Sequence, residues 1–243
     1  MRFHLLLIGL IFFSISSYAQ IEITKPIEQL GFNKNTVVLN EKGVKYQYGT
    51  WSKLIATGNY KLQPVQHDSD STAFVLVKRN EDAENKSFAK LPKPDETKFF
   101  KTGSHFDFIN MKDMSGVILK ANDLKGKIVV LNFWFIACPP CRYEMPELNR
   151  LANAYKNDKD VIFIGVTLDN TENVARFLKV SPFNYHIVSD EMALFSFYGV
   201  SECPASLVVD KTGTIRFNSQ GYGNGSVPYW LRKTIEEAKQ KVM

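Results

Sequence analysis

The stretch from residue 128 to residue 146 constrains the fold of this chain more than any other. A mostly apolar run, Ile128 to Ile136, is followed at once by Cys138-Pro139-Pro140-Cys141 and then by a mixed polar segment. An apolar run of this length is typical of a buried strand. The segment after the cysteines is predicted to be a helix to about residue 157, kinked rather than ended by Pro146. Cys138 would then lie where the strand ends and the helix starts.

Two cysteines separated by two residues in one helical turn can close a disulfide and open it again. The positive end of the helix dipole favours thiolate over thiol at the first cysteine. We therefore expect Cys138 to be the more exposed, nucleophilic cysteine and Cys141, one turn further in, to be the resolving cysteine. Half of a zinc site has the same spacing, but only Cys203 is left over and the four histidines show no ligand spacing. Thiol–disulfide exchange is favoured, and a metal site or a structural disulfide stays the alternative.

Length and composition leave room for a second module. The chain has 243 residues, which is more than a single small domain needs, and its 44% apolar content is enough for a packed core. The formal net charge of +5 is spread along the chain without a block rich in Lys and Arg. Nothing in this pattern supports nucleic-acid binding, and we predict no nucleic-acid partner.

The first nineteen residues have the pattern of a secretory signal peptide. Arg2 gives a basic start, Leu5 to Phe13 an apolar core, and Ser17-Tyr18-Ala19 a small-x-small ending. The alternative is an uncleaved membrane anchor, for which the apolar core is short. We expect a periplasmic or otherwise exported protein that is soluble after cleavage. Export would place the cysteines in an oxidising compartment, where a disulfide is a plausible resting state.

Residues 20–80 are predicted to form a small α+β module, and residues 81–100 a charged linker with two prolines. A hairpin is expected from residues 36–39 and 44–48 around Asn40-Glu41-Lys42-Gly43. A short helix would follow, capped by Thr50 or Ser52 and ended at Gly58, and then strands at 60–65 and 72–78. This module carries no catalytic constellation, and we expect it to serve docking or dimerisation.

Residues 101–243 alternate strand and helix patterns, which implies parallel pairing through right-handed crossovers. The strands are expected at 106–110, 117–119, 128–133, 161–168, 185–188, 207–209 and 215–218. Asp210-Lys211-Thr212-Gly213 is a clear hairpin signal between the last two strands. Besides the helix after Cys138, helices are expected at 171–179 and at 228–242, the latter amphipathic.

Three segments of this region resemble the thioredoxin superfamily, and specifically the TlpA/ResA-like (AhpC/TSA-Redoxin-type) branch of extracytoplasmic thiol–disulfide oxidoreductases. They are LNFWFIACPPCRYEMPEL (131–148), VIFIGVTLD (161–169) and YGVSECPASLVVDKTGTI (198–215), and they occur in the family's order. The resemblance covers roughly the last 140 residues. It implies an α/β class and a thioredoxin-like fold, a central mixed sheet flanked by helices, preceded here by the small α+β module.

The resemblance also implies roles for particular residues. Pro204 matches the family's cis-proline, beside which an extended substrate can pair. Glu144 matches a glutamate that handles protons for the buried cysteine, and Asn132 takes the place of an aspartate that many thioredoxins carry; the alternative is that Glu144 is an exposed helix charge. Ala137 replaces a tryptophan common before the first cysteine. We expect a substrate site lined by Cys203, Pro204, Pro139, Pro140 and Trp134.

Cys203 departs from the family, which commonly has no thiol before the cis-proline. It is either a third redox partner for Cys138 or a small buried apolar residue. The function that the resemblance implies is reduction of disulfides in periplasmic client proteins through the CPPC pair. An upstream thiol reductant, such as a membrane-bound one, would restore the pair, and no cofactor or metal is needed. A non-catalytic module that binds a client or a metal is the alternative, and peroxide reduction is a weaker one.

Overall fold

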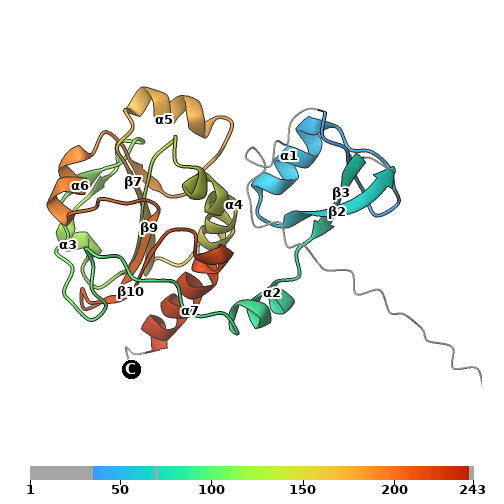
Figure 1. Cartoon of the computed structure of the whole chain (residues 1–243). Coiled ribbons are helices and arrows are strands. Elements are labelled where there is room, and N and C mark those ends of the chain that lie inside the picture. The colour runs from blue at the N-terminus through green and yellow to red at the C-terminus, as the bar shows by residue number, and fades with distance from the viewer. Residues whose placement is uncertain (1–34, 69–70, 241–243) are drawn as a thin grey trace, which may run out of the picture.

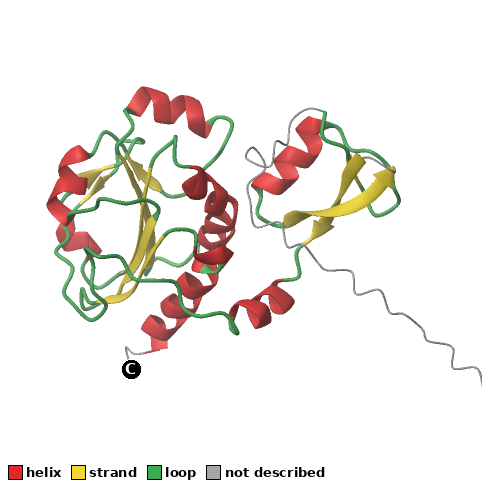
Figure 2. Ribbon diagram, in the orientation of Figure 1, coloured by secondary structure: helices red, strands yellow, loops and turns green. Residues whose placement is uncertain are grey.

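The computed structural model describes residues 35–68 and 71–240, in which the chain forms a small sheet and a large sheet, each with its own helices (Figures 1 and 2). The predicted signal peptide and the start of the mature chain lie outside the described residues. No helix in the described ranges is long and apolar enough to cross a membrane. The predicted division into domains at residues 20–80, 81–100 and 101–243 stays a prediction.

The small sheet has three strands in the order β1-β3-β2. β2 (Tyr60–Asp68) and β3 (Ser71–Lys78) are antiparallel, and β1 (Val38–Leu39) runs parallel to β3. Helix α1 (Tyr48–Ala56) covers this sheet with Trp51 and Ile55, which pack on Val38 and Leu76 in a small core of their own.

Two predictions for this module are wrong in detail. The predicted hairpin is formed only in part: the turn at residues 40–43 is closed by hydrogen bonds from the Asn40 amide to the Val44 carbonyl and from the Tyr46 amide to the Val38 carbonyl. Residues 44–48 contribute a single bridge, Leu39 to Lys45, rather than a strand. Helix α1 begins after Gln47 without a side-chain cap, earlier than a start at Thr50 or Ser52. Apolar patterning alone does not distinguish a two-residue strand from the first turn of a helix.

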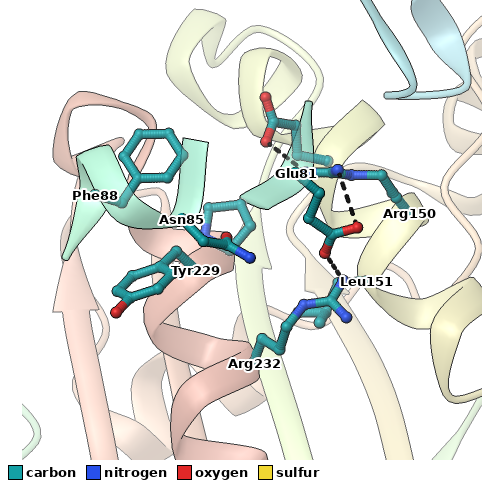
Figure 3. A pocket seen from close by; sticks show the side chains of 9 residues that line it. Glu81, Asn85, Phe88, Arg150, Leu151, Tyr229 and Arg232 are labelled. Carbon is teal, nitrogen blue, oxygen red and sulfur yellow. Dashed lines mark ion pairs between the residues drawn. The ribbon is translucent and has the colours of Figure 1, made fainter. Parts of the chain in front are cut away.

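Helix α2 (Glu81–Phe88) lies within the range predicted as a linker. Asn80 caps it by accepting a hydrogen bond from the Ala83 amide, and three acidic side chains lie in its first turn, where the helix dipole favours negative charge. Figure 1 shows α2 between the small sheet and helix α7 (Val227–Gln240). Glu81 of α2 bridges Arg150 of helix α4 (Pro139–Ala154) and Arg232 of α7, with nitrogen–oxygen distances of 3.6 and 3.1 Å (Figure 3).

The large sheet has five strands in the order β10-β9-β6-β7-β8. The parallel core is formed by β6 (Ile128–Trp134), β7 (Val161–Thr167) and β8 (His186–Val188), and β9 (Ala205–Val209) and β10 (Ile215–Gln220) complete it in antiparallel fashion. This mixed sheet flanked by helices confirms the predicted fold class. The leading hairpin is formed by β4 (Met111–Lys112) and β5 (Ile118–Leu119). Its second strand lies within the predicted range 117–119, but its first strand lies later than the predicted 106–110, where Phe106 is buried in the core.

The helices fall on two faces because side chains alternate along the central strand β6. Ile128, Val130 and Trp134 pack in one core with residues of α4 (Pro139–Ala154), α5 (Thr171–Leu178) and α7 (Val227–Gln240). Val129, Leu131 and Phe133 pack in the other core with α3 (Ala121–Leu124) and α6 (Met192–Tyr198). The sequence did not predict α6 or the short turn η1 (Gly223–Gly225). Asn132 belongs to the face that carries α4.

Candidate functional site

The site is centred on a disulfide between Cys138 and Cys141 at the start of α4, with Cα atoms 5.3 Å apart. Cys138 is the N-cap residue, and its Sγ accepts a hydrogen bond from the Cys141 amide at 3.2 Å. Pro139 and Pro140 occupy the first helical positions, where a missing amide hydrogen costs little. The free amides at a helix start favour negative charge, so the geometry can stabilise a thiolate at Cys138.

The loop that brings the chain from β6 to Cys138 is held by Asp169, which follows β7. The Asp169 carboxylate accepts hydrogen bonds from the Ile136 amide at 2.6 Å and from the Thr167 hydroxyl at 3.0 Å. Because β6 and β7 are parallel neighbours, their carboxyl ends meet at the same edge. Sequence reasoning missed Asp169, although an acidic residue directly after a buried strand is a signal that could have found it.

The structure corrects the expected exposure of Cys138. Both cysteines are buried in the disulfide form, with exposed fractions of 2% for Cys138 and 1% for Cys141. Cys138 is the more exposed of the two by only a small margin, since a helix start does not by itself reach solvent. Ala137 is exposed and Pro139 and Pro140 are partly exposed. What distinguishes Cys138 from Cys141 is its place at the amide end of the helix.

Pro204 lies at the start of β9, next to the end of β6. Ala205 pairs with Phe133, one residue before β6 ends, and the Pro204 carbonyl accepts a hydrogen bond from the Gly221 amide at 2.8 Å. The Cys203–Pro204 peptide bond is cis, as the resemblance implies. Cys203 packs on the core that holds both cysteines of the pair, and on the opposite core as well. Two predicted substrate residues are thus placed at the edge of the sheet that carries the disulfide.

Glu144 is buried, with 1% of its surface exposed, so the reading of it as an exposed helix charge is wrong. Its Oε1 accepts a hydrogen bond from the Asn132 side chain at 2.8 Å, and the same amide group donates to the Ser206 hydroxyl at 2.9 Å. Among the described residues, Oε2 has no hydrogen-bond partner. Burial raises the pKa of Glu144 to about 8, while the Asn132 hydrogen bond opposes the rise. A carboxyl with this pKa can both accept and return a proton near neutral pH.

Two further buried groups, Tyr185 and Trp134, and the half-buried Cys203 lie around this carboxyl or the disulfide. Tyr185, which the sequence did not single out, lies directly before β8; burial first, and then the charge of Glu144, raise the pKa of its hydroxyl. Trp134 is fully buried in the core that holds the disulfide, with its ring against Phe177 and Phe183. Burial, followed by the charge of Glu144, raises the pKa of the Cys203 thiol to about 12. Cys203 is therefore a thiol rather than a thiolate at neutral pH.

In the fully reduced protein, we expect Cys203 to be alkylated much more slowly than Cys138 at neutral pH. The thiolate is the reactive form, and the raised pKa of Cys203 leaves little of it. Timed alkylation followed by peptide mapping measures both rates, and denatured protein, in which the three thiols become equivalent, is the control. Equal rates in the folded protein would contradict the raised pKa of the Cys203 thiol.

The described residues contain no group of three or more His, Cys, Asp and Glu side chains that could hold a metal ion. The two sulfur atoms of the CPPC motif bond to each other in this structure. The site thus consists of a disulfide at the start of α4 and a buried carboxyl one turn further along the same helix.

Comparisons with known proteins agree with this geometry. Residues 102–218 match the AhpC/TSA family. This part of the chain is therefore similar to the AhpC/TSA family. A thiol-disulfide oxidoreductase ResA of Bacillus cereus is 37% identical over 105 residues, which cover 42% of this chain and 60% of the relative. The thioredoxin-like protein YneN of Bacillus subtilis is 30% identical over 109 residues, 44% of this chain and 64% of the relative.

Solved structures show the same fold. A Chlorobium tepidum protein described as a candidate thiol:disulfide interchange protein DsbE superimposes with a TM-score of 0.51 at 26% identity, over 57% of this chain and 98% of that one. A candidate protein disulfide isomerase from Bacteroides thetaiotaomicron has a TM-score of 0.51 at 21% identity, over 58% of this chain and 94% of that one. At this identity the likeness supports the fold alone. The family match leaves the small sheet outside, since residues 38–78 precede the matched range.

Proposed function

We propose that this protein is an exported thiol–disulfide oxidoreductase that reduces disulfides of client proteins through Cys138 and Cys141. The observation that supports this most is the disulfide at the amide end of α4, one turn from a buried carboxyl with a pKa of about 8. The relatives named as thiol-disulfide oxidoreductases support the reaction class. The signal-peptide pattern of the first nineteen residues supports export.

The reaction begins from the dithiol form. The Cys138 thiolate attacks one sulfur of a client disulfide, so that a Cys138–client bond forms, the client bond breaks and one client thiolate leaves. Glu144 then accepts the proton of the Cys141 thiol, and the resulting thiolate attacks Cys138 Sγ. The Cys138–Cys141 disulfide forms again, and the second client sulfur leaves as a thiolate that takes up a proton. Two electrons pass from the pair to the client, and an upstream thiol reductant returns them.

The near-complete burial of Cys138 favours one alternative, a module that binds a client without exchanging electrons with it. A single measurement distinguishes the two. The protein is equilibrated with glutathione buffers and the Cys138–Cys141 thiols are counted by alkylation. We expect a reduction potential below about −250 mV, as for a reductant, whereas a value of about −120 mV would identify an oxidant. A pair that does not exchange with glutathione would support the binding module.

A further inference from the structure

The small sheet touches the helix that carries the disulfide, and the exchange steps do not use this contact. Gly58, in the turn between α1 and β2, has a φ of +72°, and a Cβ atom there would lie 2.2 Å from the Pro146 carbonyl oxygen and 2.7 Å from its carbonyl carbon. The two backbones are therefore in direct contact, and only glycine fits at this position.

Arg79, directly after β3, adds a charge to the same contact. Its guanidinium lies 2.5 Å from Glu147 Oε1 of α4 and 3.2 Å from Glu84 Oε2 of α2. The Arg79 amide bonds to the Asn59 carbonyl, next to Gly58. One end of the small sheet thus presents a backbone to residue 146 and a cation to residue 147 of the disulfide helix.

Glu147 is buried, with 7% of its surface exposed. Burial raises its pKa, and the charges of Arg79 and then Arg150 oppose the rise. Its charged surroundings come from four elements: Arg79 after β3, Arg150 on α4, Glu84 on α2 and Lys61 on β2. An uncompensated carboxylate here would be costly, so Arg79 supports the ionised form of Glu147.

Glu147 also lies close to the chemistry. Cys141, Glu144 and Glu147 follow one another at three-residue spacing, which makes each a neighbour of the next on the helix surface. Glu144 accepts a hydrogen bond from Asn132 of β6. Its charge also acts on Tyr185, which precedes β8, and on Cys203, which precedes β9. Pro146 has no amide hydrogen, so α4 lacks one backbone hydrogen bond in this turn. The position of this turn of α4 therefore depends more on contacts with other elements than it would in a helix with all its backbone hydrogen bonds.

We propose that Arg79 is a positioning residue: by pairing with Glu147 it fixes the turn of α4 that carries Glu144, and so sets the equilibrium between the disulfide and dithiol forms of Cys138 and Cys141. The inference rests on the proposed function only where it gives Glu144 the proton-handling role. In this proposal, the small sheet fixes the position of α4, the helix that carries the disulfide.

The test measures the equilibrium of full-length Arg79→Gln with glutathione across neutral pH, by alkylation and mass spectrometry. We expect the equilibrium constant to change about threefold or more, as for coupled neighbours, and its pH dependence to shift. Arg79→Lys, which keeps the charge, should restore part of the wild-type behaviour. Arg216→Gln is the matched control, because it removes an arginine–carboxylate pair between Arg216 of β10 and Asp210 in the turn before it, away from α4.

An Arg79→Gln protein that only melts earlier, with an unchanged equilibrium constant and pH dependence, would overturn the proposal and leave Arg79 a structural role. If Arg79→Gln does not fold, Glu147→Gln replaces it, since this variant keeps the shape of the side chain and removes the charge that Arg79 pairs with. A changed equilibrium constant with glutathione and a shifted pH dependence in Glu147→Gln would support the proposal. Wild-type values of both would overturn it. Because glutathione is the only partner, these outcomes do not depend on whether the protein reduces clients.

Discussion

Cys138→Ser should lower the catalysed reduction of a disulfide-bonded test protein to the uncatalysed background. The variant has no sulfur at the amide end of α4, where the Cys141 amide now meets Cys138 Sγ, and a hydroxyl does not replace a thiolate as nucleophile. Cys141→Ser should also lose turnover, because the mixed disulfide formed at Cys138 then has no resolving thiol. The measurement is the rate of thiol release from the test protein with a small thiol as the electron source.

Far-UV circular dichroism of both serine variants shows whether the fold is kept, which separates loss of chemistry from loss of structure. If folded Cys138→Ser retains full reductase activity, the assignment of Cys138 as the nucleophile is wrong. If only Cys141→Ser is inactive, the roles of the two cysteines are exchanged.

Glu144→Gln should remove a large pH dependence from the stability of the oxidised protein. Glu144 has a pKa of about 8 in the folded chain, against 4.5 for an ordinary glutamate. At acid pH the Glu144 carboxyl is protonated in both the folded and the unfolded chain, so its burial does not lower the free energy of unfolding. As the pH rises from about 4.5 to about 8, the unfolded chain releases the proton while the folded chain keeps it. The free energy of unfolding then falls by a few kcal/mol, at most about 5 kcal/mol.

The experiment is denaturant unfolding of the disulfide form at a series of pH values, where the paired cysteines do not titrate. Other acids also contribute to the slope, so the quantity to compare is the difference between wild type and variant. Glu202→Gln is the matched control, since Glu202 is exposed near the same site, and we expect it to keep the wild-type slope. Parallel curves for wild type and Glu144→Gln would contradict the buried, proton-retaining state of Glu144.

The large sheet and the centre of the site could be predicted because their signals are local. The apolar run before Cys138 is a strand buried on both faces, and CPPC begins a helix that continues through Pro146. The segment Asp210 to Gly213 forms the predicted turn between β9 and β10. In each case one short stretch of sequence is enough to predict the local structure, and the tertiary contacts agree with that local preference.

What the sequence could not predict depends on contacts between distant segments. The exposure of Cys138 is set by neighbours from other elements, and so its burial was missed. Residues 44–48 have strand-like composition, but packing of the small core places the last of them in α1. The pairing of Arg79 with Glu147 joins residues sixty-eight positions apart, and neither residue type signals a partner in advance. Tyr185 was missed for the same reason.

The most direct test of the central claim is to map the mixed disulfide that Cys141→Ser forms with a disulfide-bonded test protein. Reduced variant is mixed with the test protein, quenched in acid and digested without reductant, and the cross-linked peptides are identified by mass spectrometry. The account predicts that the client sulfur is bonded to Cys138 in the trapped complex. A client bonded to Cys203 instead, or the absence of any cross-link while wild-type protein turns over, would contradict it.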